Sequence, residues 1–207
     1  MTSTVLNPTL RAELLEMRQA DLRLRAELVR DGSLFEGYNE RMAELHRRHN
    51  ARLALVLAQH GWPGRSLVGE DGAAAAWLLL QHAILDPPLM RQAVPLLEQA
   101  VHANDAEPKH LAFLVDRIRT MEGRPQIYGT SHDWDETGNI SPLPIDDPAT
   151  VDERRQRVGL EPLAENTNRL RAQAEAEGEK PPADYEKRRR EADAWSRATG
   201  WRSREED

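Results

Sequence analysis

The sequence predicts a mainly α-helical protein, with a single domain like a helical bundle and a short β-hairpin or ordered loop near residues 126–145. Apolar residues recur at helical spacing over most of the chain, which is the main signal of amphipathic helices. Residues 73–85 are mostly alanine and leucine, which are strong helix formers. Extended character is confined to residues 126–134 and 140–145.

Four helices are expected in the first half of the chain. The first begins at Asn7 and Pro8, a capping residue followed by proline at the first helical position, and Gly32 is a suitable stop. Asp71 is expected to cap the third helix. Pro95 should kink or divide the fourth, because proline lacks an N–H and crowds the preceding turn. The four expected helices span residues 7–32, 39–60, about 71–85 and about 88–103.

The second half of the chain is expected to hold shorter helices on either side of the extended region. Pro108 opens a fifth helix and Gly123 ends it. A turn at 135–139 joins the two extended segments, and Pro142 and Pro144 weaken the second of them as a strand. The remaining expected helices span about 147–158 and about 184–197, the latter with Trp195 and Trp201 as its anchors.

The length of 207 residues fits one domain with an appendage. We expect a helical core domain over residues 1–163, which includes a loop at 121–146. A polar, charged helical extension over 164–207 is expected either to pack on this core or to be partly mobile. A long stretch without helix in a helical protein is more often functional than idle, so the 121–146 loop is the expected place for a site.

The composition excludes several classes of protein. The net charge of -7 argues against a general nucleic-acid binder, which needs a basic field. The absence of cysteine excludes disulfides, thiolate metal sites and cysteine nucleophiles. No signal peptide is expected, and the apolar run at 73–85 is shorter than the about 20 residues that cross a bilayer. We therefore expect a cytoplasmic protein with a small-molecule ligand and no membrane or nucleic-acid partner; the sequence leaves the oligomeric state open.

Gln81 and His82 are the polar pair in the longest apolar run of the chain. A polar side chain on an apolar helix costs about 1–3 kcal/mol unless it finds a hydrogen-bond partner. Two readings follow. His82 and Gln81 are held by a neighbouring helix as structural residues, or they face a pocket as an acid, a base or a ligand contact.

Asp116 and Arg117 lie away from the apolar stripe of the fifth helix. One reading places both on a solvated face. In the other reading the following loop folds back over them, so that Asp116 orients a base and Arg117 clamps a carboxylate or phosphate.

The loop that follows carries three hydrogen-bonding side chains at alternate positions. Gln126, Tyr128 and Thr130 project to one side of an extended segment and form either a recognition surface or the wet side of an edge strand. Arg155, with Arg154, stands beside acidic residues early in a later helix, where surface ion pairs and anion binding are the two alternatives.

Metal binding is not expected, and no cofactor is expected. His46 and His49 are spaced i,i+3 and can share a helix face, which would give two ligands. The His-Glu-x-x-His motif is missing, and so are a P-loop, a Gly-x-Gly-x-x-Gly fingerprint and a Gly-x-Ser-x-Gly elbow.

Five segments, taken together and in this order, resemble an uncharacterised bacterial family, number 6624 of the domain-of-unknown-function series. The resemblance extends from about Leu10 to Leu163 and implies a small, mostly helical protein without implying an activity. The family pattern usually reads Tyr-Gly-Thr-Gln, whereas Ser131 stands at the last position here. The segments are Gly61–Gly69, Ala76–Ala83, Leu114–Arg117, Gly123–Thr130 and Arg154–Leu160.

Three functions are compatible with these residues. The first is a metal-independent enzyme for a small polar or anionic substrate, and the second is a ligand-binding or interaction module in which the polar groups lock the loop. The third is a metal-dependent enzyme, which requires His46, His49 or His82 to meet another histidine or a carboxylate within ligand distance. For the first, the expected catalytic residues are His82, Asp116 and Tyr128, and the expected substrate-binding residues are Gln81, Arg117, Gln126, Thr130 and Arg155.

Overall fold

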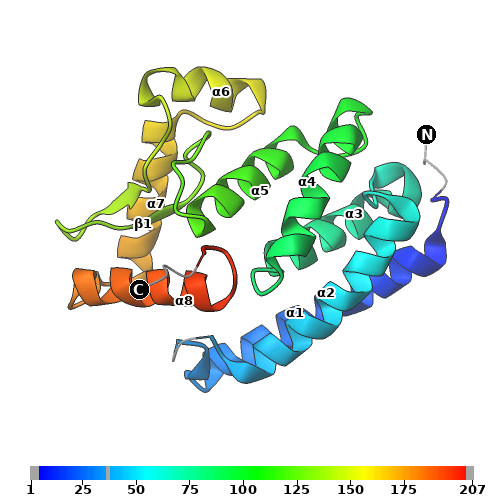
Figure 1. Cartoon of the computed structure of the whole chain (residues 1–207), viewed down its shortest axis with the longest axis horizontal. Coiled ribbons are helices and arrows are strands. Elements are labelled where there is room, and N and C mark those ends of the chain that lie inside the picture. Colours follow the sequence, from blue (N-terminus) through cyan, green and yellow to red (C-terminus); the bar gives the residue numbers. More distant parts are fainter. Residues whose placement is uncertain (1–4, 36–37, 204–207) are drawn as a thin grey trace. The chain divides into compact units, whose positions relative to one another are not determined.

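A computed structural model describes residues 5–35 and 38–203 and has the predicted mainly α-helical fold (Figure 1). Within these residues the chain forms eight α-helices, two short 3-10 helices and one two-stranded antiparallel hairpin. The chain divides into two compact units between Glu107 and Pro108. This division differs from the expected boundary after residue 163.

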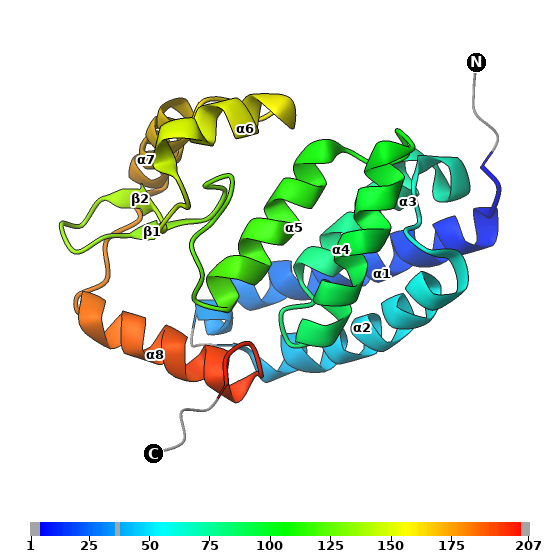
Figure 2. The same ribbon diagram turned by 45° about the horizontal axis from the view of Figure 1, so that its top comes forward.

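The first unit contains four α-helices and a 3-10 helix, Ser33–Phe35. Helix α1 packs against both α2 and α3, and α2 also contacts α4. Figure 2 shows α1 and α2 running alongside each other. The core of this unit includes apolar side chains that recur at helical spacing, such as Leu14, Leu53 and Val56, all at 0% exposure. The bounds are Pro8–Arg30 for α1, Glu40–His60 for α2, Arg65–Gln81 for α3 and Pro87–His102 for α4.

Side-chain caps begin three of these helices, at or next to the starts that the sequence predicts. The Asn7 carboxamide oxygen accepts the backbone N–H of Leu10, and Asn39 accepts that of Arg41 in the same way. The Asp86 carboxylate caps α4 by accepting the N–H of Leu89. These caps supply acceptors for N–H groups that the first helical turn leaves without partners.

Two predictions about the helices of the first unit need correction: the expected start of the third helix is wrong, and of the two effects expected of Pro95, a division of its helix does not occur. Helix α3 begins at Arg65, well before Asp71, because the chain turns at Gly69 (φ 73°) and continues as helix on both sides of that residue. Asp71 pairs with Arg11 of α1 while also accepting the N–H of Gly72. Pro95 lies inside α4 without dividing it.

The second unit contains the hairpin, four further α-helices and a 3-10 helix, Pro148–Thr150. The hairpin pairs β1, His132–Trp134, with β2, Ile140–Pro142, through the turn predicted at 135–139. Helix α7 contacts α6 and β2, so the segment after residue 163 belongs to this unit. The helices are α5 (Pro108–Met121), α6 (Val151–Arg157), α7 (Leu163–Glu177) and α8 (Tyr185–Ala198).

No helix within residues 5–35 and 38–203 combines the length and the apolar character that a membrane crossing needs.

Candidate functional site

A buried carboxylate of the first unit, Asp21, lies at the centre of the candidate site. Asp21 interrupts the apolar stripe of α1, yet it is 0% exposed and faces inward like the leucines around it. Burial of an ionised carboxylate costs several kcal/mol unless donors or a cation compensate it. The partners of Asp21 therefore decide what this position does.

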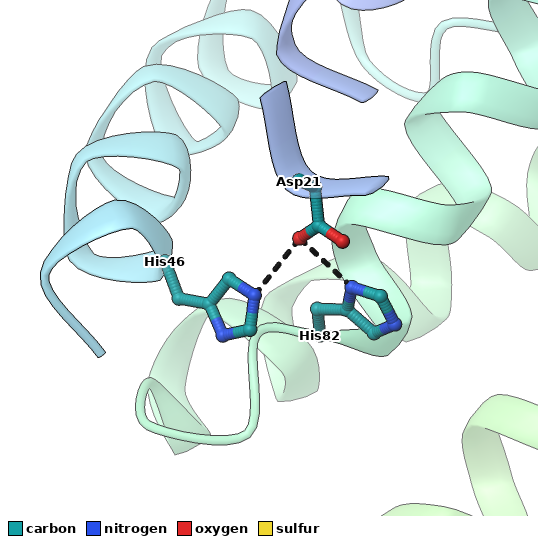
Figure 3. A group of neighbouring side chains, drawn as sticks. All are labelled: Asp21, His46 and His82. Carbon is teal, nitrogen blue, oxygen red and sulfur yellow. Dashed lines mark hydrogen bonds and ion pairs between the residues drawn. The ribbon is translucent and has the colours of Figure 1, made fainter. Parts of the chain in front are cut away.

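Two histidines from different helices donate to the same oxygen of Asp21 (Figure 3). The Oδ2 atom lies 2.8 Å from Nε2 of His46, on α2, and 2.9 Å from Nδ1 of His82, which ends α3. The other ring nitrogen of His46, Nδ1, hydrogen bonds with the Tyr38 hydroxyl. Three helices thus bring Asp21, His46 and His82 together, with Tyr38 behind His46.

The electrostatics of the cluster define the proton positions. Burial opposes ionisation of Asp21, but the hydrogen bonds from His46 and His82 outweigh it and hold the pKa of this carboxyl well below its usual range. An ionised carboxylate can only accept, so His46 carries hydrogen on Nε2 and His82 carries it on Nδ1. Burial and then the charge of Asp21 raise the pKa of Tyr38 to about 12, so the phenol stays protonated and donates to His46.

The same three side chains form a set of metal-ligand atoms. One carboxylate oxygen of Asp21 and one ring nitrogen each of His46 and His82 lie within 4.8 Å of one another. Nitrogen and oxygen donors of these types bind Zn²⁺, Fe²⁺ and similar ions. The geometry meets the condition stated for the metal-dependent alternative, because His82 and His46 both reach a carboxylate.

The second oxygen of the Asp21 carboxylate takes no part in the hydrogen bonds described above. Oδ1 of Asp21 is buried and accepts no hydrogen bond from any residue that the structure describes. A buried acceptor without a donor costs about 1–3 kcal/mol, and more when it carries charge. A bound cation would compensate this oxygen.

His49, which the i,i+3 spacing pairs with His46, is not part of the ligand set. It is 8% exposed, and its Nδ1 atom has no hydrogen-bond partner within residues 5–35 and 38–203. Burial lowers the pKa of His49 and keeps its ring neutral.

His82 is the member of the cluster that reaches solvent. Its side chain is 30% exposed, compared with 7% for His46 and 0% for Asp21. A molecule in solution therefore meets the cluster at His82.

In the second unit, Asp116 anchors the loop that follows α5 and does not stand on a solvated face. Its buried carboxylate accepts the backbone N–H groups of Ile127, Tyr128 and Thr130 at 2.7–3.1 Å, and also the Thr130 hydroxyl at 3.0 Å. The loop folds back over Asp116, as one of the two sequence readings requires. His82 hydrogen bonds with the carboxylate of Asp21, whereas Asp116 was the expected partner.

Gln126 and Arg155 hold the same loop from within, which corrects two expectations. Gln126 is 0% exposed and bonds both the N–H and the C=O of Ser131, so it is neither a recognition group nor the wet side of a strand. Arg155 is 1% exposed and donates to the backbone oxygens of Tyr128, Gly129 and Glu161 instead of forming surface ion pairs.

The remaining predicted site residues occupy less central positions. Tyr128 contributes its backbone N–H and C=O to the loop network, and its side chain is half-buried. Arg117 and Thr130 line a cavity of the second unit. Gln81 is the last residue of α3 and is half-buried beside His82.

Asp21 and Tyr38 were missed as site residues. Asp21 carried the same signal as Gln81 and His82, since it is a charged residue in an apolar helical stripe. Tyr38 lies in the connection before α2, where no periodicity marks a residue as buried.

The protein is thus mainly α-helical, and its Asp–His–His cluster is a candidate catalytic or metal centre. The chain matches the family of unknown function DUF6624 over residues 8–180 and therefore belongs to this family, which confirms the resemblance. No curated protein and no solved structure matches the chain.

Proposed function

We propose that this protein is a metal-dependent enzyme with one divalent transition-metal ion bound by Asp21, His46 and His82. The observation that carries the proposal is the gathering of these three donor atoms within 4.8 Å, from helices α1, α2 and α3. Three protein ligands leave coordination positions for water or substrate, which is the arrangement of catalytic rather than structural sites.

The surroundings of Asp21 favour a metal over a purely structural network. The two histidines donate to Oδ2 and leave Oδ1 of the buried carboxylate without a donor among the described residues. A divalent ion held by these three side chains would supply a countercharge to the buried carboxylate.

Metal binding to this cluster requires an exchange of tautomers. His46 would move its proton from Nε2 to Nδ1 and donate it to the Tyr38 oxygen, which now donates to the same atom. His82 would carry its proton on Nε2 instead of Nδ1. A ligating histidine whose second nitrogen donates to an oxygen is the usual arrangement in metal sites, and Tyr38 is placed to accept from His46.

The ligand types narrow the metal and the chemistry. Two imidazoles and a carboxylate suit Zn²⁺ or Fe²⁺ better than Ca²⁺ or Mg²⁺, which prefer sets made entirely of oxygen. Such an ion polarises a substrate oxygen and lowers the pKa of a bound water. The 30% exposure of His82 places that chemistry at the solvent side of the cluster.

A second candidate function, metal-independent acid–base catalysis, is supported by one specific contact. The Nδ1–H of His82 bonds the buried carboxylate of Asp21 at 2.9 Å, which leaves Nε2 as a base. A carboxylate that orients a histidine in this way is a recurring catalytic device. In this alternative His46 has only a supporting role.

Metal titration separates the two functions. Chelator-stripped protein is titrated with Zn²⁺ by calorimetry and with Co²⁺ by visible absorption, which reports the ligand geometry. We expect one equivalent to bind, and Asp21→Asn, His46→Gln and His82→Gln each to weaken binding by at least ~100-fold. Exposed histidines at the ends of α2 and α4 provide matched controls, His60→Gln and His102→Gln, that keep wild-type affinity.

Two results would refute the metal proposal. One is a folded wild-type protein that binds neither ion at a stoichiometry near one. The other is binding that His82→Gln and His60→Gln weaken equally, since that result would place the ion on surface histidines. Loss of hydrolysis of p-nitrophenyl esters on chelation, with recovery on adding metal, would support the enzymatic part of the proposal.

A further inference from the structure

The second unit contains a cavity of about 610 Å³ that the metal centre of the first unit does not involve. Its walls come from α5, the β1–β2 hairpin, α7 and the start of α8. This volume lies within the range of roughly 300–1,000 Å³ that small-molecule sites occupy. The loop held by Asp116 forms one wall through Thr130 and Ser131.

The anchored loop makes this cavity a preformed feature. The Thr130 N–H and hydroxyl both bond Asp116, and both backbone groups of Ser131 bond the Gln126 carboxamide. Asp116 and Gln126, which the sequence suggested as site residues, thus hold the wall of a cavity from behind. A rigid wall lowers the entropy cost of binding, since less of the site must be ordered.

Arg117 gives the cavity a cationic group. It projects from α5, is half-buried, and burial lowers its pKa, because the guanidinium has lost part of its hydration. A guanidinium has five N–H donors in a fork that fits a carboxylate, so an anion can bind it in addition to other contacts. The neighbouring ring of His132 is neutral at pH 7, because burial lowers its pKa.

The apolar part of the wall comes from aromatic and aliphatic side chains. Phe113 of α5 and Trp134 of β1 line the cavity together with Leu143 and Leu170. Aromatic side chains bury large areas, so they favour a ligand with an apolar or aromatic body.

Acidic residues restrict the charge of the ligand. Glu177 and Glu179 line the cavity and are exposed, and the second arginine of the wall, Arg188, is ion-paired with Asp133 at 2.9 Å. Additional negative charge on the ligand would meet these carboxylates, and like charges repel. The lining therefore selects against polyanions such as nucleotides.

We infer that this cavity binds a small organic monocarboxylate, with its carboxylate on Arg117 and its apolar body against Phe113 and Trp134. The site is separate from the metal centre in its residues and in its chemistry. It also gives the Asp116 loop a role, which is to shape a ligand-binding wall.

The charge requirement can be tested on the wild-type protein with three probes that share a phenyl ring. Phenylacetate carries the monoanion, methyl phenylacetate lacks the charge, and phenyl phosphate carries a second charge. Titrations followed by ¹H–¹⁵N chemical shifts should show phenylacetate perturbing the amides of residues 130–134, with the other two probes at least ~10-fold weaker. Equal binding of phenylacetate and its ester, or no perturbation by phenylacetate at about 10 mM, roughly ten times the Kd of a ligand with millimolar affinity, would overturn the inference.

The role of Arg117 has its own matched pair of variants. Arg117→Gln should weaken phenylacetate binding by at least ~10-fold, because it removes the charge and the bidentate fork. Arg190→Gln makes the same change on an exposed residue of α8 outside the cavity lining and should leave binding unchanged. Equal weakening by both variants would contradict the assigned anchor. Should Arg117→Gln fail to fold, Arg117→Lys keeps the charge, loses the fork and is expected to bind with intermediate affinity.

Discussion

The Nδ1 atom of His82 lies 2.9 Å from Oδ2 of Asp21, although 61 positions separate the two residues in the chain. This contact joins the end of α3 to the middle of α1. His46 reaches the same oxygen from α2, so one carboxylate connects three helices of the first unit. Such a buried junction is costly to maintain without a compensating role, which is the physical basis for proposing a metal there.

Asp116→Asn should release the loop of the second unit and lower the free energy of unfolding by about 3 kcal/mol. Oδ2 of Asp116 accepts both the N–H and the hydroxyl of Thr130, and an amide NH₂ group in its place would oppose those donors. Urea denaturation measures the loss. Glu175→Gln removes a charge from an exposed position of α7 and should change stability by less than about 0.5 kcal/mol.

A loss below about 1 kcal/mol for Asp116→Asn would contradict the anchoring role of Asp116. Hydrogen exchange offers a local readout, because the amides of Ile127, Tyr128 and Thr130 should exchange faster in the variant than in the wild type.

Gly129→Ala should destabilise the protein more than Gly159→Ala, by about 1–2 kcal/mol. Both glycines have positive φ, 64° and 74°, so both variants carry the left-handed strain of an L-residue. A Cβ on Gly129 would also stand 2.7 Å from Cδ1 of Ile145, whereas one on Gly159 would meet nothing within 4 Å. Thermal and urea unfolding of the pair isolates the steric part, and equal losses would show that Ile145 moves aside without cost.

Much of the fold was predictable because its signals are local. The side chains of Asn7, Asn39 and Asp86 cap helices by accepting backbone N–H groups only two or three residues further along the chain. Glycines or prolines end most helical segments. The start of α3 was not predictable from such signals. Gly69 looks like a helix breaker, and the helix continues past it where α1 and α3 pack and Asp71 pairs with Arg11 of α1.

The site was predictable only in part, because its contacts are long-range. His82 and Asp116 stood out as polar residues among apolar ones, but the sequence does not say which buried carboxylate meets which donor. Asp21 carried the same signal, and its pairing with His82 depends on how α1 and α3 pack. Gln126 could be identified as a buried group only once its Ser131 partner was known.

The hairpin turn should lose its order as the pH falls. Hydrogen bonds from the Ser141 and Thr137 side chains and from loop N–H groups hold the pKa of Asp135 below its ordinary value. A depressed folded-state pKa means that this contribution is present above the unfolded pKa, about 3.9, and is lost as the pH falls through the folded pKa. Amide shifts of residues 137–139 followed from pH 6 downward would report it.

Asp135→Asn provides the control for this pH dependence. The variant cannot ionise, so residues 137–139 should show no transition of their own and should resemble the acid form of the wild type at pH 6. A transition of these wild-type amides centred at the unfolded pKa, about 3.9, would contradict the role given to Asp135, because its hydrogen bonds hold the folded-state pKa below that value.

Tyr38→Phe should weaken metal binding by about 10-fold or more without removing a metal ligand. The Tyr38 hydroxyl hydrogen bonds Nδ1 of His46, so in the metal-bound form it would accept the proton on that nitrogen and keep Nε2 directed at the ion. Phenylalanine keeps the ring and loses this acceptor. Zn²⁺ calorimetry and Co²⁺ absorption measure the affinity and the geometry of the site.

A stability loss alone would not explain that result, because a destabilised but folded protein binds with its native affinity. Tyr185→Phe removes a hydroxyl from the first position of α8, in the other unit, and should leave Zn²⁺ affinity unchanged. Wild-type affinity in Tyr38→Phe would show that His46 is oriented by its helix alone. A tenfold loss with an altered Co²⁺ spectrum would identify Tyr38 as the residue that positions His46 for the metal.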